Sequence, residues 1–504
     1  MMKAAYPLLF CTFIMLCCPL AADAATATLI VADDVSDPAT LDPQKQFLEK
    51  NHTICQQIFD GLLRFDPDGN IEPALAVSWA WRDPLTVRLK LRPGIKFHNG
   101  EPFSAQAVKF TIDRYLDAKT GFPARGYIDS IMRVDIIDPL TVDIVTVYPD
   151  GLLLNRLAAF ILISPPEYLK KVGEEYFAAH PIGTGAFVFS EWIKGKEITL
   201  TANDNYWMPE YPKVKKLVFK FLPVSRQLPA ILSGEVNLVT NLPGTQTRAV
   251  MENPRAAVMK KYAFRTVAVF LNFSSGPLRD VNLRKALNHA LDRSELIRYD
   301  LLGNGLPIAT LSMKGETGHN AKLAPYPFDP DRAKELLHNA GYGNGLSLSV
   351  LAKRNAERTV KIIASQLEKV GIELKVKFVT ESASPDEFKN GKYDMAIADI
   401  PDPMCHIFFI GAMGLSSQSP YSLGKDASID KMLHEIASTI DAKGQKEKAE
   451  TFDTYVYDNA LGLFTYQKAT TLAASKNLHF KPHVTGMPYF FGAYFDDDKK
   501  AKSR

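Results

Sequence analysis

The chain has few cysteines. Only five of its 504 residues are cysteine, and three of them, Cys11, Cys17 and Cys18, lie within the first 24 residues. An exported protein could join the other two, Cys55 and Cys405, in a disulfide. We expect two free thiols instead, because the domain organisation inferred below places them on opposite sides of a moving cleft, where a disulfide would lock the motion.

Charge of one sign is also lacking. The chain carries 59 Lys and Arg against 56 Asp and Glu, for a formal net charge of +3. This near balance does not provide the basic surface that a nucleic-acid-binding protein needs. No apolar run beyond the N-terminus reaches the roughly 18 residues of a membrane-spanning helix. The hydrophobic fraction of 46% is that of a globular protein, and 504 residues predict two or three domains.

Familiar catalytic motifs are missing as well. The sequence has no His-Glu-x-x-His, no Gly-x-Ser-x-Gly and no phosphate-binding Gly-x4-Gly-Lys. Residues 422–425 (SLGK) and 119–121 (KTG) imitate two motifs of the penicillin-binding enzymes, but their order along the chain is reversed. The sequence therefore predicts a protein that is not an enzyme and that needs no cofactor.

The first 24 residues have the pattern of a secretory signal peptide. They begin with one cation, Lys3, continue with an apolar run over residues 8–20 and end in a small-x-small pattern at Ala24. We predict export to the periplasm with cleavage after Ala24. The apolar run is too short for a membrane span, and its cysteine pair lacks the preceding small residue of a lipoprotein site. A buried N-terminal helix is the alternative.

Helical and strand patterns interleave along the rest of the chain. Gly371 is a one-residue link between a helical pattern and an alternating one, which is typical of a mixed α/β layer. An apolar strand over 266–273 ends in a turn that predicts a crossover between domains, with a return near 470–474. Spacing and caps predict helices beginning after Ser104 and Asp329 and over 356–370, and strands over 86–91, 217–221, 372–378 and 393–397.

Several segments together resemble one protein family. In residues 180–207, Gly183 and Gly185 allow a tight turn that leads into an aromatic, β-forming run. Further segments follow the same family pattern in the same order, at 40–43 (TLDP), 58–62 (IFDGL), 72–79 (EPALAVSW), 91–100 (LRPGIKFHNG), 284–293 (RKALNHALDR) and 328–341 (FDPDRAKELLHNAG). The chain thus resembles family 5 of the bacterial extracytoplasmic solute-binding proteins, the peptide/nickel-binding class of ABC importers.

The resemblance implies an α/β, two-lobed periplasmic-binding-protein type II fold with an extra subdomain in the first lobe. Such lobes close over a ligand in the cleft between them, because ligand contacts with both lobes favour the closed form. The boundaries that we expect are 1–24 for the signal peptide, 25–65, 183–268 and 470–504 for lobe I, 66–182 for the extra subdomain and 269–469 for lobe II.

The resemblance also implies an aspartate in lobe II that holds the α-ammonium group of a peptide. Asp402 is the best match and Asp399 the second. A buried carboxylate needs a charged partner, which a ligand amine can supply. The alternative is a loop carboxylate capped by its own backbone. Many relatives have Trp before this loop, whereas this chain has Ala396 and Ala398, which could leave room for a bulkier ligand.

Four further residues are candidates for ligand contacts. Arg125 could pair with a carboxylate or phosphate, or be a solvated loop arginine. His52 and His406, the latter beside Cys405, could bind a transition metal or its chelate, although ordinary buried histidines are the alternative. Tyr489 could line the cleft near the hinge or belong to the core.

The predicted function is capture of a small ligand, a short peptide in the first instance, and its delivery to an ABC permease in the inner membrane. The alternative within the class is a nickel or metal-chelate binding protein. A binding protein that delivers its ligand to a sensor is a third possibility, which the sequence leaves open. We expect a monomer.

Overall fold

The structure, a computed structural model, describes residues 27–33, 37–380, 387 and 392–496. The predicted signal peptide and its cleavage site lie outside these ranges. In the part of the chain that is described, none of the helices combines the length and the apolar character that crossing a bilayer requires.

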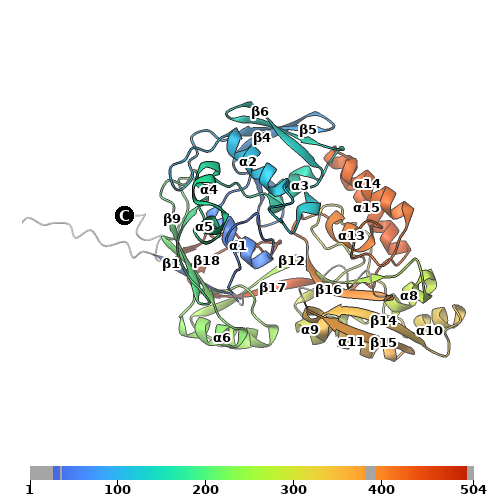
Figure 1. Cartoon of the computed structure of the whole chain (residues 1–504). Coiled ribbons are helices and arrows are strands. Elements are labelled where there is room, and N and C mark those ends of the chain that lie inside the picture. The colour runs from blue at the N-terminus through green and yellow to red at the C-terminus, as the bar shows by residue number, and fades with distance from the viewer. Residues whose placement is uncertain (1–26, 34–36, 381–386, 388–391, 497–504) are drawn as a thin grey trace, which may run out of the picture.

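One mixed sheet connects the two halves of the molecule (Figure 1). Strands β1, β10 and β11 pair in parallel at one end, and β14, β15 and β16 pair in parallel at the other. The spatial order is β15 (Ile372–Val379), β14 (Leu346–Lys353), β16 (Met395–Pro401), β12 (Ala256–Leu271), β17 (Tyr466–Ser475), β11 (Leu238–Val239), β1 (Thr28–Asp33), β10 (Lys216–Phe221), β9 (Glu197–Ala202) and β8 (Phe187–Ile193), with β13 (Gly305–Pro307) paired to β17. Because parallel strands need crossover connections, each end is an α/β unit.

Two strands, β12 and β17, cross the middle of this sheet and join its ends (Figure 1). Residues 256–262 of β12 pair antiparallel with β17, whereas residues 265–271 pair antiparallel with β16. Strand β17 also pairs with β11 at the other end of the sheet. The strands predicted at 266–273 and near 470–474 are therefore confirmed, while the exact domain boundaries stay a prediction.

Helices pack on both ends of the sheet. The end around β1 carries α1 (Glu49–Ile58), α4 (Pro166–Val172) and α5 (Glu174–Ala179) in one core, and α6 (Val224–Ser233) and α7 (Thr247–Glu252) in another. The end around β14 carries α8 (Val281–Ala290), α9 (Arg293–Leu301), α10 (Pro330–Asn339) and α11 (Glu357–Glu368). These two ends are the two lobes of the molecule.

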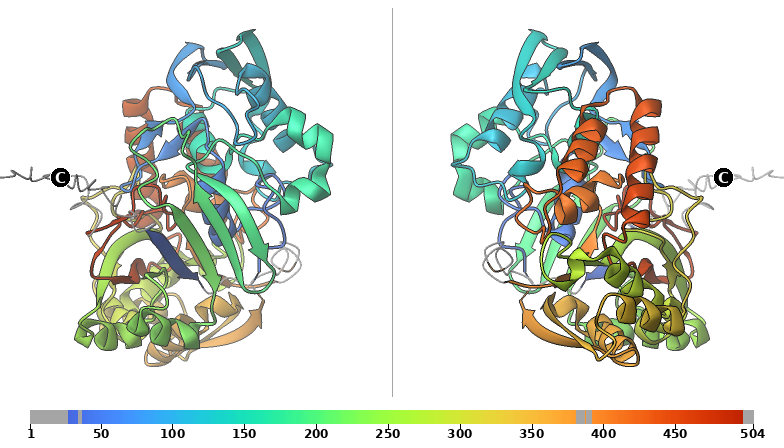
Figure 2. Two further views of the ribbon diagram at one scale, coloured as in Figure 1. Left: turned by 90° about the vertical axis from the view of Figure 1, so that its left-hand side faces the viewer. Right: turned by 90° about the vertical axis from the view of Figure 1, so that its right-hand side faces the viewer.

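A second sheet lies at the top of the molecule in Figure 1, within the segment predicted to be the extra subdomain. Its strands are β4 (Ala76–Asp83), β5 (Thr86–Leu91), β7 (Thr141–Thr146) and β6 (Ile131–Asp138), and α2 (Ala105–Leu116) and α3 (Leu153–Phe160) share its core. Helices α13 (Phe408–Leu415), α14 (Ala427–Ser438) and α15 (Ala442–Asp458), in orange in Figure 2, contribute to the same core cluster as this sheet. Two short pairs complete the strands, β2 (Leu63–Phe65) with β3 (Ile71–Pro73) and β18 (Leu478–His479) with β19 (Tyr494–Phe495).

The local predictions hold where caps and alternation are clear. The Asp329 carboxylate accepts the backbone N–H of Arg332 at 2.9 Å and caps α10. Gly371 follows α11 with a φ of 86°, a conformation that favours glycine. Ser104 does precede α2, but its side chain makes no capping hydrogen bond. The predicted strands are confirmed as β5, β10, β15 and β16.

The four-stranded unit touches the second lobe directly. The backbone N–H of Gly151 donates to the carbonyl oxygen of Ala437 at 2.6 Å. Close by, the Asn155 amide donates to the carbonyl oxygen of Met404 at 2.8 Å. The first contact joins the loop before α3 to α14, and the second joins α3 to the loop after β16.

Gly151→Val should hold the four-stranded unit and the second lobe apart. A Cβ atom at Gly151 would lie 1.8 Å from the carbonyl oxygen of Thr439, and forcing extra bulk into a packed contact costs about 1–3 kcal/mol. We expect a larger radius of gyration in small-angle scattering, with an unchanged far-UV circular dichroism spectrum. Gly126→Val is the matched control, because a Cβ there meets no heavy atom within 4 Å. Equal radii for the wild type and both variants would contradict the prediction.

Candidate ligand-binding site

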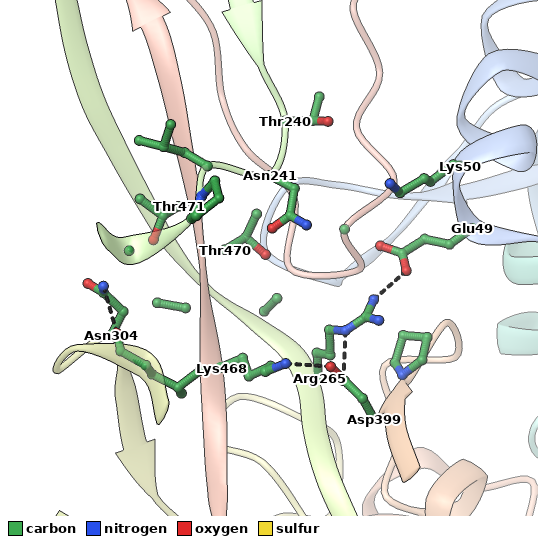
Figure 3. A pocket seen from close by; sticks show the side chains of 18 of the residues that line it. Glu49, Lys50, Thr240, Asn241, Arg265, Asn304, Asp399, Lys468, Thr470 and Thr471 are labelled. Atoms are coloured by element: carbon green, nitrogen blue, oxygen red, sulfur yellow. Dashed lines mark hydrogen bonds and ion pairs between the residues drawn. The ribbon is translucent and has the colours of Figure 1, made fainter. Parts of the chain in front are cut away.

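A cavity of about 480 Å³ lies between the two lobes, a size suited to a small ligand. Its walls come from the carboxyl end of β1 at Asp33, the start of α1 at Glu49 and Lys50, the crossing strands β12 and β17, and the carboxyl end of β16 at Asp399 (Figure 3). Carboxyl ends of parallel strands are where α/β sheets usually bind ligands. We therefore take this cavity, called the cleft pocket below, as the candidate site.

A chain of ion pairs runs through the cleft pocket and links its walls (Figure 3). Arg265 on β12 donates from Nε to Asp399 Oδ1 at 2.8 Å and from Nη1 to Glu49 Oε2 at 2.6 Å. Lys468 on β17 binds the second oxygen of Asp399. One arginine on a crossing strand thus holds a carboxylate from each lobe.

The carboxylates of the cleft pocket differ in how well their charges are compensated. Burial raises the pKa of Asp399, but Lys468 and Arg265 outweigh it and hold that pKa below its ordinary value. Burial also raises the pKa of Glu49, and here the opposing charge of Arg265 is not enough. The pKa of Asp33 is raised by burial in the same way, although Lys50 lies 2.9 Å from its Oδ1. For Asp33 and Glu49, the one cation beside each carboxylate does not offset the effect of burial on its pKa.

The rest of the lining combines neutral polar side chains with apolar residues and glycines. It also holds one further ion pair, between Asp300 and the largely exposed Arg358. The neutral polar groups can accept or donate hydrogen bonds to a ligand without a net charge. The neutral polar members are Thr53, Thr240, Asn241, Thr245, Asn304, Thr470, Thr471 and Thr485.

The two aspartates predicted from the sequence have different surroundings. Asp399 lines the cleft pocket, whereas Asp402 lies outside its lining and is fully buried. The carboxylate of Asp402 accepts the backbone N–H groups of Met404 and His406, each at 2.7 Å. Burial raises the pKa of Asp402 to about 6, and a hydrogen bond from Glu316 opposes that rise. The structure therefore favours capping by the local backbone, the alternative left open above, for Asp402.

The other predicted residues are scattered. His52 and Tyr489 line a second, much smaller cavity. His406 is buried, which lowers its pKa to about 3, and its Nδ1 accepts a backbone N–H from the start of α13. Arg125 is exposed in a short 3-10 helix, donates from Nε to the carbonyl oxygen of Leu116 and lines neither cavity.

Both remaining cysteines are buried and unpaired, which confirms the prediction of two free thiols. Burial raises the pKa of Cys55 and of Cys405 above the ordinary value of a thiol. Among the residues that the structure describes, no group of three or more His, Cys, Asp or Glu side chains is arranged to hold a metal ion.

Sequence inspection did not single out Glu49, Arg265 or Lys468. A signal was present, because Arg265 stands directly before the apolar run of β12 and Lys468 interrupts the run of β17. A lone charge beside an otherwise apolar, buried strand is unusual and needs a partner. The sequence did not indicate the partner of Arg265, since Glu49 lies 216 residues away from it.

Comparison with known proteins places the chain in a family. The model described as bacterial extracellular solute-binding proteins, family 5 Middle, matches residues 70–405. The chain belongs to this family. The expected resemblance is thereby confirmed, and the chain is a solute-binding protein of the ABC-importer class.

Relatives and solved structures agree with this assignment. The glutathione-binding protein GsiB of Pectobacterium atrosepticum is 28% identical over 347 residues, which are 67% of this chain and 66% of that protein. The binding protein DppA from Helicobacter pylori, in complex with the peptide STSA, has a TM-score of 0.78 and 24% identity, covering 93% of this chain and 98% of that one. NikZ from Campylobacter jejuni, in complex with Ni(L-His), has a TM-score of 0.74 and 22% identity, covering 91% and 97%. The two-lobed type II fold is confirmed.

Glu316→Gln should stabilise the protein at high pH. Burial raises the pKa of Glu316 well above its ordinary value of 4.5, and the nearby charge of Asp402 raises it further. The folded state then keeps a proton that the unfolded state has lost, so stability declines as the pH rises above about 4.5. A glutamine can still accept the backbone N–H of Met313, as Glu316 does at 2.6 Å, and can donate to Asp402 without titrating.

We expect the free energy of unfolding in denaturant to be similar for wild type and Glu316→Gln near pH 4, and roughly 1 kcal/mol or more higher for the variant at pH 8. Glu175→Gln, which changes an exposed glutamate, is the control and should follow the wild type at every pH. A variant that is less stable than the wild type at pH 8 would show that the proton is not shared between Glu316 and Asp402.

Proposed function

We propose that this protein captures a short peptide with a free amino terminus in the cleft pocket and delivers it to an ABC permease of the inner membrane. It works in the periplasm as a monomer, after removal of the predicted signal peptide, and leaves the ligand chemically unchanged. Membership in the solute-binding family and the position of the cleft pocket between the lobes support this proposal.

The two carboxylates whose pKa is raised, Asp33 and Glu49, carry the choice of ligand. Asp33 and Glu49 are close enough for the charge of Asp33 to raise the pKa of Glu49, and burial raises the pKa of both above their ordinary values. An ammonium group between them would add positive charge and strengthen both carboxylates as hydrogen-bond acceptors. A neutral or anionic ligand would add no positive charge.

The opposite charge of the ligand also has partners in the cleft pocket. Lys50, Lys468 and Arg358 all line it, in ion pairs with Asp33, Asp399 and Asp300 respectively, and a ligand carboxylate would share these cations. They come from helix α1 of the first lobe, the crossing strand β17 and helix α11 of the second lobe. A peptide that offers an ammonium and a carboxylate can therefore contact both lobes at once. Contacts of that kind favour the closed form over the open one.

The nickel or metal-chelate alternative stays a prediction from the sequence. His52 and His406 are both buried, and neither of them lines the cleft pocket. A peptide therefore accounts for the charges of this pocket better than a metal chelate does.

Glu49→Gln should weaken binding of peptides that have a free amino terminus. A hydrogen bond to a charged group contributes about 1.5–3 kcal/mol, so we expect the affinity for alanyl-alanine in isothermal titration calorimetry to fall by at least about tenfold. The wild type should bind N-acetyl-alanyl-alanine weakly, and Glu49→Gln should not weaken that peptide further.

Glu210→Gln, at an exposed position, is the control and should bind alanyl-alanine as the wild type does. If Glu49→Gln weakens the acetylated and free peptides by the same factor, the ammonium is not held at Glu49. If the wild type binds no peptide of either kind, the proposed function is wrong.

A further inference from the structure

We propose that the second, smaller cavity is a side-chain subsite of the cleft that accepts a small uncharged group with a hydroxyl, such as the side chain of serine. The proposal rests on the proposed function, because it concerns the same ligand. The cavity has a volume of about 20 Å³ and is lined by His52, Gln56, Phe65, Ala158, Ala159, Pro403, His483, Thr485, Met487 and Tyr489. It thus receives residues from α1, α3, the loop after β16 and the segment before β19.

The small cavity adjoins the cleft pocket. Thr485 lines both cavities. Thr53 lines the cleft pocket while its neighbour His52 lines the small cavity, and both belong to the same turn of α1. A ligand bound in the cleft pocket can therefore direct one side chain past Thr485 into the small cavity.

One wall of the small cavity is fixed by side-chain amides. Gln56 Nε2 donates to the carbonyl oxygens of Met487 and Pro488, each at 2.8 Å. Gln57 Nε2 donates to Pro488 at 3.0 Å, and its Oε1 accepts the backbone N–H of Phe490 at 2.9 Å. These bonds hold the segment that carries Tyr489 against α1, so this wall of the cavity is fixed without a ligand.

His52, one of the residues that line this cavity, has an unmet hydrogen bond. The residue is only 4% exposed, and its Nδ1 is buried without a hydrogen-bond partner among the described residues. A buried polar atom that lacks a partner is unfavourable. A hydroxyl group serves either tautomer of the imidazole, because it can donate to the bare nitrogen or accept from the N–H.

The lining carries no charge at neutral pH. Burial lowers the pKa of His52 to about 4 and is also the main reason why the pKa of His483 is lowered to about 4. Arg64 lies 5.5 Å from the centre of the Tyr489 ring, but it is paired with Glu72 at 2.5 Å. A charged side chain would therefore lose its hydration here without gaining a counter-ion.

The volume sets the size of the group. A space of about 20 Å³ is enough for one water-sized group. Ala158 and Ala159 on α3 form part of the wall, and the hydrogen bond from Asn155 to the carbonyl oxygen of Met404 connects that helix to the loop after β16. Serine adds one hydroxyl to alanine, so the two side chains differ by the group for which the cavity has room.

Calorimetry with alanyl-alanine, seryl-alanine and alanyl-serine tests the subsite on the whole protein. Because a hydrogen bond to a neutral partner changes affinity modestly, we expect one of the two serine peptides to bind about three- to tenfold tighter than alanyl-alanine. His52→Leu should bring that ratio close to one. His52→Asn, whose side-chain amide can replace Nδ1, should keep the preference, and His338→Leu, at an exposed position on α10, should not change it.

The outcomes separate the subsite from the proposed function. If the wild type binds all three peptides equally, or if His52→Leu keeps the preference for serine, the subsite is wrong while peptide capture stands. If the wild type binds none of the three, both are wrong. Should His52→Leu fail to fold, the ratio measured with His52→Asn against the wild type decides, because loss of the preference there would overturn a role for the Nδ1 position.

Discussion

The cleft depends on the ion pairs of Arg265, because its guanidinium binds one carboxylate from each lobe. The pairing of β12 with β16 places Arg265 opposite Pro401 and Val267 opposite Asp399, and this register brings the arginine within 2.8 Å of Asp399. Glu49 reaches the same arginine from α1 at 2.6 Å. A buried charge without a partner is strongly unfavourable. This one side chain on a crossing strand therefore joins charged groups of both lobes inside the cleft pocket.

The acidic groups of the cleft fall into two kinds, and the difference explains their separate roles. Asp402 satisfies the backbone of its own loop, and Asp399 is held by two cations. Asp33 and Glu49 have one cation each, and burial outweighs it. Carboxylates of the first kind stabilise the protein's own structure. Only carboxylates of the second kind would gain further positive charge from a ligand. For this reason burial alone does not identify a binding residue.

Sequence patterns predicted the parts of the fold that depend on neighbours in the chain. The cap at Asp329, the break at Gly371 and the alternation of β15 are local, and they appear as expected. The two-lobed organisation was predicted from the family motifs, because local patterns do not show how distant segments are arranged. The site was predicted only in part, since Asp399 lines the cleft pocket but Arg125 does not. The missing members, Glu49 and Arg265, are brought together by tertiary contacts, which no spacing in the sequence records.

The amide bonds of Gln56 have a consequence for how the protein matures. They join α1 to Met487 and Pro488, which follow Gln56 by 431 and 432 positions, so helix α1 obtains its wall from residues that are synthesised long after it. Until residues 483–490 have been made, neither cavity has its full lining. A partly synthesised chain therefore has no finished cleft in which to trap a passing solute.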